Sequence, residues 1–186
     1  MKGYVYQPAE DSELLLEAVI KELKPSDTVL EVGTGSGFIA KNLAGKCKRI
    51  VATDISPFAV KEAKRWGIDV IRTDLFLGLK RIFTLVIFNP PYLELEDWEK
   101  KNDWIDVAID GGRGGIETAV RFLSRLDEVM VDCGRAMLVL SSISDNSAFR
   151  RACSDLGYTA DVVLRRRLFL EELYVYRVER KIKIHK

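Results

Sequence analysis

The sequence predicts an α/β fold, a doubly wound and mainly parallel sheet of seven strands whose last strand is antiparallel. Short apolar runs alternate along the chain with segments of helical periodicity, and this alternation is typical of parallel strand–helix–strand units. A glycine-rich turn directly follows the first apolar run and opens a helix, as in ligand sites of such folds. For 186 residues we expect one domain over 1–180 and a basic tail at 181–186.

Each element follows from a local pattern. Leucine, alanine and valine at helical spacing predict a first helix over 10–23, with Asp11 or Ser12 as its cap. The predicted strands are 28–32, 49–53, 68–72, 83–88, 135–141, 159–164 and 173–178. Further helices are predicted over 36–44, 57–66, 116–131 and 146–156. The second of these begins at Pro57, where proline suits a first helical turn.

The stretch 89–115 is predicted to be irregular, and its length favours a functional flap. Trp98 and Trp104 lie within it and could cover a target or simply bury apolar area. The run Gly-Gly-Arg-Gly-Gly at 111–115 is interpreted more readily as a flexible lead into the next helix than as a hinge.

The composition excludes several classes of protein. A net charge of +1 argues against a protein that holds nucleic acid mainly through its phosphates. The sequence has neither a run of eighteen apolar residues nor a charged-then-apolar leader, so we expect no membrane span and no secretory signal. Cys47, Cys133 and Cys153 have no metal or disulfide spacing, which predicts reduced thiols, no bound metal and a cytoplasmic protein.

Glycines after the first strand indicate a ligand site. Gly33, Gly35 and Gly37 have the spacing Gly-x-Gly-x-Gly, which lets the backbone turn sharply and approach a ligand closely. Phe38 stands where the dinucleotide motif has its third glycine, and no Gly-Lys-Ser/Thr follows. These differences argue against NAD and against a nucleoside triphosphate.

Three acids define the ligand more closely. Asp54 ends the second strand, where a carboxylate can accept hydrogen bonds from ribose hydroxyls. Asp74 follows the third strand, in position to accept a hydrogen bond from the amino group of an adenine. Glu31 precedes the first glycine and could attract a positively charged amino acid. Either aspartate alone would more often be a solvated strand end. Together with the glycines, the acids describe adenosine joined to a charged amino acid, and they predict S-adenosylmethionine as cofactor.

The tetrapeptide Asn89-Pro90-Pro91-Tyr92 follows the fourth strand, at the same edge of the sheet as the glycines. An amide or aromatic-amine nitrogen is a poor nucleophile because its lone pair is delocalised. The Asn89 side-chain oxygen and the Pro90 carbonyl can each accept one N–H bond from such an NH₂ group. The prolines fix the backbone, and the Tyr92 ring offers a surface for stacking. We therefore predict methyl transfer to a planar NH₂ nitrogen, with Asn89, Pro90 and Tyr92 as catalytic residues.

These motifs resemble the HemK-type protein-glutamine methyltransferases, specifically the short archaeal and eukaryotic class that modifies translation release factors. The resemblance is carried by residues 5–12, 31–37, 54, 74–75, 89–92 and 108–115. It implies a Rossmann-like class I S-adenosylmethionine-dependent methyltransferase that modifies the glutamine in the Gly-Gly-Gln loop of a class I release factor. By position, it implies cofactor contacts from Ser12, Glu31, Gly33, Asp54, Asp74, Leu75 and Asn89. It implies target contacts from Asn89, Pro90, Pro91, Tyr92 and Leu93.

The same resemblance implies a small zinc-binding activator subunit and hence a heterodimer. The strand order expected for the fold leaves 68–72 at a sheet edge, where a further strand can pair. Two other functions stay open. An adenine amino-methyltransferase would share Asn-Pro-Pro-Tyr, but it would need base flipping and a basic surface or an added domain. A cofactor-binding scaffold without activity would not need Asn89, Pro90 and Tyr92 together.

Overall fold

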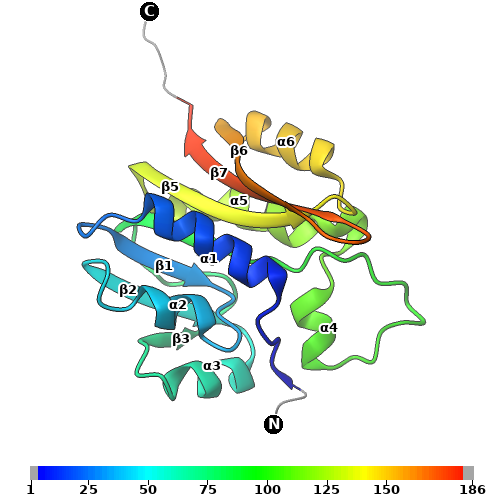
Figure 1. The fold of residues 1–186 in the computed structure, drawn as a ribbon, viewed down its shortest axis with the longest axis horizontal. Helices are drawn as coiled ribbons and strands as arrows, with labels where there is room; N and C mark the ends of the chain where they lie inside the picture. The colour runs from blue at the N-terminus through cyan, green and yellow to red at the C-terminus, as the bar shows by residue number, and fades with distance from the viewer. Residues whose placement is uncertain (1–3, 182–186) are drawn as a thin grey trace, which may run out of the picture.

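A computed structural model of the chain describes residues 4–181, which leaves 182–186 of the predicted basic tail outside the described residues (Figure 1). Seven strands form one sheet in the order β3-β2-β1-β4-β5-β7-β6. The five parallel strands are β1 (Thr28–Val32), β2 (Arg49–Asp54), β3 (Val70–Arg72), β4 (Phe83–Phe88) and β5 (Met130–Ser141). The antiparallel end consists of β7 (Glu172–Arg180) and β6 (Tyr158–Arg167). The predicted fold class is confirmed.

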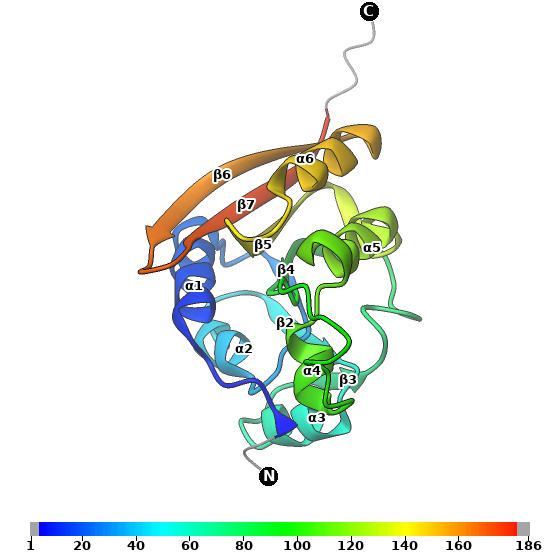
Figure 2. The same ribbon diagram turned by 90° about the vertical axis from the view of Figure 1, so that its right-hand side faces the viewer.

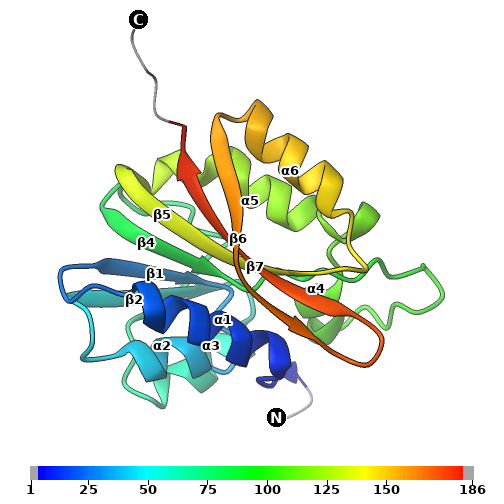
Figure 3. The same cartoon turned by 45° about the horizontal axis from the view of Figure 1, so that its top comes forward.

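Helices cover both faces of the sheet (Figure 3). One face carries α1 (Glu10–Glu22), α2 (Phe38–Leu43) and α3 (Pro57–Lys64), and the other carries α5 (Glu117–Arg125) and α6 (Asn146–Asp155). Alternate residues of β4 serve the two cores: Leu85 and Ile87 pack toward α1, whereas Val86 and Phe88 pack toward α5. In the part of the chain that the structure describes, no helix is long and apolar enough to cross a membrane.

Four predictions about the elements are wrong. The helix expected over 116–131 ends at Arg125, a 3₁₀ turn follows, and β5 already begins at Met130 rather than at residue 135. Apolar residues continue through Val129 and Met130, both fully buried, so periodicity alone could not separate helix from strand here. Gly134 makes the early start possible, because a Cβ at this position would lie 2.6 Å from the Met130 side chain.

The other two wrong predictions concern a helix that was not expected and the cap of the first helix. The stretch expected to be irregular contains α4 (Trp104–Ile109), whose start is capped by the Asp103 side chain accepting from the N–H groups of residues 105 and 106. The first helix is capped at Ala9 without a side-chain bond, so neither Asp11 nor Ser12 is its cap. Both side chains are buried inside the first helical turn instead.

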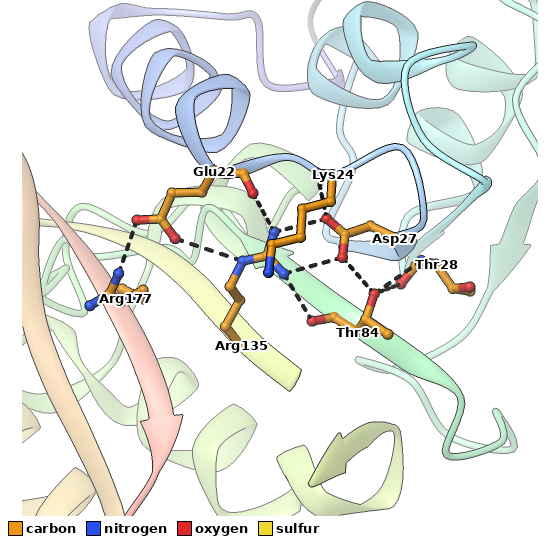
Figure 4. A network of polar contacts seen from close by, with 7 residues as sticks. All are labelled: Glu22, Lys24, Asp27, Thr28, Thr84, Arg135 and Arg177. Atoms are coloured by element: carbon orange, nitrogen blue, oxygen red, sulfur yellow. Dashed lines mark hydrogen bonds and ion pairs between the residues drawn. The ribbon is translucent and has the colours of Figure 1, made fainter. Parts of the chain in front are cut away.

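A buried ion-pair network joins the amino ends of the strands to α1 (Figure 4). Arg135 donates to the Asp27 carboxylate at 2.8 Å and to the Glu22 carbonyl at 2.6 Å, and Thr84 also donates to Asp27. Burial opposes ionisation of Asp27, but the bonds from Arg135, from the Lys24 N–H and from Thr84 lower the pKa of its carboxyl. This stabilisation is complete above the ordinary pKa of 3.8 and is lost as the pH falls through the lowered value.

Removing the cation of this network should destabilise the fold. Arg135→Ala is expected to lower the free energy of unfolding by about 3 kcal/mol, because it leaves the Asp27 carboxylate buried without its partner. Arg49→Ala is the matched control, since the Arg49–Asp69 pair is exposed at 3.5 Å and should contribute less than about 0.5 kcal/mol. Urea unfolding of the two variants checks this, and equal losses would contradict it.

Candidate active site

A cavity of about 620 Å³ opens at the carboxyl ends of β1, β2 and β4, where doubly wound sheets bind their ligands. Figure 2 views the molecule from this end, with α4 in front of the sheet. The volume lies within the range of small-molecule sites. Every residue predicted for the site lines this cavity: Ser12, Glu31, Gly33, Gly35, Asp54, Asp74, Leu75, Asn89, Pro90, Pro91, Tyr92 and Leu93.

The glycine turn brings backbone close to the cavity. Gly33 and Gly35 have φ angles of 63° and 54°, in the left-handed region that favours glycine. A Cβ on Gly33 would lie 3.2 Å from the Phe88 ring. The Thr34 N–H donates to the Thr53 carbonyl at 2.9 Å, which ties the turn to the end of β2. Residues 33–36 all line the cavity, so the turn borders the space for a ligand.

The two predicted ribose and adenine acceptors already have partners in the chain. Asp54 accepts from the N–H groups of Gly35 at 2.9 Å and Ser56 at 2.8 Å, and burial raises the pKa of its carboxyl. Asp74 accepts from both terminal nitrogens of Arg121 at 3.0 and 3.1 Å. Sequence reasoning missed Arg121, which comes from α5 and has no local motif that marks it.

Glu31 is a buried acid at the floor of the site. Its side chain is 3% exposed and accepts from the Thr34 hydroxyl at 2.8 Å and from the Ala40 N–H at 3.0 Å. Burial raises the pKa of Glu31 from 4.5 to about 8. Among residues 4–181, the groups that bond to Glu31 or act on its charge are Thr34, Ala40 and Asp54, and none of them is a cation. A positively charged ligand in the cavity would supply the missing partner and favour the ionised carboxylate.

Asn89 presents an unsatisfied acceptor. Its Nδ2 donates to the Ser12 hydroxyl at 3.4 Å, whereas its Oδ1 is buried and has no hydrogen-bond partner within the described residues. Buried polar atoms are almost always paired, so an unpaired one calls for an explanation. A ligand that brings an N–H group to this oxygen would complete its bonding.

The Tyr92 hydroxyl donates to Asp11 at 3.2 Å, and the Tyr6 hydroxyl donates to the same carboxylate oxygen at 2.8 Å. Asp11 is 3% exposed, and burial together with this acid raises the pKa of both tyrosines. Sequence reasoning gave Asp11 only a capping role and gave Tyr6 none. The available sequence signal was an acid in the first helical turn, five positions after a tyrosine that precedes the helix.

The glycine run 111–115 packs against the backbone of the tetrapeptide. Gly115 has a φ of 65°, and a Cβ there would overlap the Tyr92 carbonyl oxygen; a Cβ on Gly111 would lie 2.6 Å from the Pro91 carbonyl oxygen. The Ser144 hydroxyl donates to the Tyr92 carbonyl at 3.0 Å. The run is therefore a close packing surface, and its interpretation as a flexible lead into the helix is wrong.

The two tryptophans of the predicted flap behave differently. Trp104 lines the cavity and contacts Phe58 edge to face, with ring centroids 6.4 Å apart. Phe58 also stacks on Tyr4 at 4.9 Å, so aromatic rings close one side of the mouth. Trp98 is 83% exposed and does not line the cavity. Within residues 4–181 no group of three or more His, Cys, Asp or Glu side chains is arranged to hold a metal ion.

Comparison of the sequence with known proteins gives consistent matches. The family described as "Methyltransferase small domain" matches residues 8–106. A Methanocaldococcus jannaschii protein that is provisionally named a protein N5-glutamine methyltransferase is 36% identical; the alignment covers 92% of this chain and 89% of that protein. The mouse (Mus musculus) protein named methyltransferase HEMK2 is 33% identical, over 93% of this chain and 88% of its own length.

A solved structure shares both fold and sequence. A chain of the E. cuniculi Mtq2–Trm112 complex superposes with a TM-score of 0.79 and 26% identity. The superposition covers 95% of this chain and 99% of that one. That complex is described as responsible for the methylation of the eRF1 translation termination factor.

Proposed function

The chain belongs to the S-adenosylmethionine-dependent protein-glutamine methyltransferases, and we propose that its target is the glutamine in the Gly-Gly-Gln loop of a class I translation release factor. The unpartnered Asn89 Oδ1 at the end of β4 carries this proposal, because a planar NH₂ group is the donor that fits it. Release factors act in translation, so we place the reaction in the cytoplasm.

The residues of the cavity fit S-adenosylmethionine. The buried Glu31 lacks a cationic partner within the described residues, and the glycine turn leaves open backbone beside it. When bound, this cofactor supplies a sulfonium methyl group that needs no strong base to react. We propose that Glu31 faces the charged amino acid part, Asp54 the ribose and Asp74 the adenine. The further proposed cofactor contacts are Ser12, Gly33, Gly35, Leu75 and Asn89.

The acceptor role falls to the tetrapeptide. Asn89 Oδ1 and the Pro90 carbonyl accept the two N–H bonds of the target amide, and this holds its nitrogen at the cavity. The Tyr92 ring provides the stacking surface for the planar amide, and Pro91 and Leu93 complete the contact. Two acceptors of this kind hold both N–H bonds in the amide plane and leave the nitrogen lone pair, which is perpendicular to that plane, free to meet the methyl group.

Cofactor affinity should depend on pH through Glu31. A cationic ligand favours ionised Glu31, so the association constant is expected to rise about tenfold between about pH 6.5 and 8.5. Without ligand, the free energy of unfolding should instead fall as the pH rises. Between pH 4.5 and about 8 the folded state keeps a proton on Glu31 that the unfolded chain has released. Calorimetry of Glu31→Gln, whose affinity should not vary in this window, is the control; a parallel pH profile would refute the role.

Removing Asp54 should weaken cofactor binding. Asp54→Ala is expected to raise the dissociation constant about 30-fold, because the carboxylate both meets the ribose and holds the N–H groups of residues 35 and 56. Asp69→Ala, an exposed acid in the loop before β3, is the control and should bind normally. Unchanged affinity of Asp54→Ala by calorimetry would contradict the proposed ribose contact.

The free edge of β3 is the site at which we propose that a partner subunit binds. β3 pairs with β2 alone in the described part of the chain, and it carries Ile71, which is 42% exposed. We propose that a small zinc-binding activator adds a strand there and forms a heterodimer. In co-expression, Ile71→Asp should abolish copurification with such an activator, whereas Ile20→Asp, exposed on α1, should not. Full activity and solubility of the chain by itself would count against the partner.

Mass spectrometry tests the function directly. The chain, with a candidate activator, should add one methyl group to the loop glutamine of a release factor, and none to a factor with glutamate there. Nucleic acid is the second arm, because adenine amino-methyltransferases remain the competing class. Acidic residues outnumber basic ones in the segment that borders the mouth of the cavity, which disfavours binding of a nucleic-acid phosphate backbone. The acids are Glu94, Glu96, Asp97, Glu99, Asp103 and Asp106, and the bases are Lys100 and Lys101. Methylated adenine without methylated glutamine would overturn the proposal.

A further inference from the structure

We propose that Asp11 is a positioning residue that sets the direction of the Asn89 amide. Asp11 is buried at the start of α1 and accepts four hydrogen bonds. Its Oδ1 accepts from the Ser12 N–H at 2.5 Å and from the Ser12 hydroxyl at 3.0 Å. Ser12 in turn contacts Asn89, so a chain of two hydrogen bonds links the acid to the acceptor amide.

The direction of these two hydrogen bonds follows from which atoms can donate a proton and which can only accept one. A carboxylate oxygen that meets a backbone N–H can only accept, so the single proton of the Ser12 hydroxyl goes to Asp11. The Ser12 oxygen must then accept from its other neighbour, which lies 3.4 Å away. Only the NH₂ end of the Asn89 amide can donate. Its carbonyl end therefore faces the cavity, where Oδ1 is found without a partner among the described residues.

The opposite orientation would defeat the site. An Asn89 amide turned by 180° would present two N–H donors to the NH₂ group of the target, and donors do not bind donors. An isolated asparagine has little preference between the two orientations, because its oxygen and nitrogen have nearly the same shape. Asp11 supplies the preference before any target arrives. The inference thus deepens the proposed function, on which its catalytic consequence rests.

The other oxygen of Asp11 holds the acid in place. The hydroxyls of Tyr6 and Tyr92 both donate to Oδ2, from the segment before α1 and from the tetrapeptide after β4. These hydroxyls can donate or accept, whereas the Ser12 N–H can only donate. An asparagine at position 11 would therefore turn its oxygen to Ser12 and its NH₂ to the tyrosines. Asp11→Asn therefore keeps the direction of the hydrogen bonds that run from Asn89 through Ser12 to residue 11, and it removes the negative charge of Asp11.

This difference gives the test. Asp11→Ala should lower kcat about 100-fold at saturating cofactor, with KM for the release factor and cofactor affinity within about threefold of wild type. Asp11→Asn should restore kcat to within about fivefold of wild type. Glu10→Ala, the exposed acid next to it, is the matched control and should leave kcat unchanged. In NMR spectra, the Asn89 side-chain NH₂ signals should shift in Asp11→Ala and stay in place in Asp11→Asn.

Each outcome decides the proposal. A folded Asp11→Ala variant with kcat within about threefold of wild type would overturn it, and so would an Asp11→Asn variant as inactive as Asp11→Ala. Should Asp11→Ala fail to fold, Ser12→Ala takes its place, because it breaks the same chain and should give the same loss and the same NMR shift. Should wild type not methylate the release factor, the proposed function fails, while the NMR signals still show whether Asp11 sets the amide.

Discussion

Asn89→Ala is expected to lower kcat about 1000-fold, because it removes one of the two acceptors that hold the target nitrogen. Cofactor affinity should change by less than about threefold, since the loss falls on positioning of the target. The folded state should not suffer, because the deleted oxygen is already unpaired and the bond to Ser12 is long at 3.4 Å. Single-turnover kinetics with a release factor measure the effect.

The control for this experiment is Asn42→Ala on α2, whose amide, within the described residues, donates to the carbonyl of Phe38 at the start of its own helix. It should leave kcat unchanged. Methylation by Asn89→Ala at the wild-type rate would remove the acceptor from the mechanism. It would also revive the alternative that the cavity binds a cofactor without directing its chemistry. A loss of cofactor affinity as large as the loss of kcat would instead show that the main role of Asn89 is its cofactor contact.

Gly115→Ala is expected to reduce kcat at least about 100-fold, although this residue does not line the cavity. A Cβ there would overlap the Tyr92 carbonyl oxygen and lie 3.2 Å from the Ser144 hydroxyl, so the tetrapeptide backbone must move. A displacement of about 1 Å in a positioning element costs about 100-fold in rate. The rate of methyl transfer at saturating cofactor is the measurement.

Backbone strain alone could produce part of that loss, since Gly115 has a φ of 65°. Gly157→Ala separates the two effects: its φ is 81°, yet among the described residues no atom beyond its chain neighbours lies within 4 Å of the Cβ position. Both variants should lose roughly 1 kcal/mol of stability from strain, but only Gly115→Ala should lose activity. Equal kcat values for the two alanine variants would show that the glycine run does not position the tetrapeptide.

The sequence predicted the sheet and the cavity because both depend on local patterns. Gly33 and Asn89 each follow a strand and Asp54 ends one, and parallel strands end at one edge, so their meeting needed no further information. β1 and β4 appear at their predicted bounds, since each is a short apolar run between clear turns. Motifs that sit at the ends of strands are therefore the part of such a site that a sequence can reveal.

What the sequence could not predict depends on partners far away along the chain. Arg121 joins Asp74 across 47 positions, and Arg135 joins Asp27 across 108. No spacing rule links such pairs, because tertiary packing alone brings them together. The role of Gly115 was hidden for the same reason: glycine is common in loops, and only the nearness of the Tyr92 carbonyl makes it irreplaceable.

The chain leaves the tetrapeptide at Leu93 and returns to it at Asp110, where the two positions bridge and the Leu93 N–H bonds to the Ile109 carbonyl at 3.0 Å. Whatever lies between these points is an insert whose two ends are clamped together. Changes in its length are therefore expected to leave the tetrapeptide in place, because the two ends of the segment stay paired. Replacing the segment between residues 93 and 110 with the corresponding segment of a relative offers a route to enzymes that methylate other target proteins.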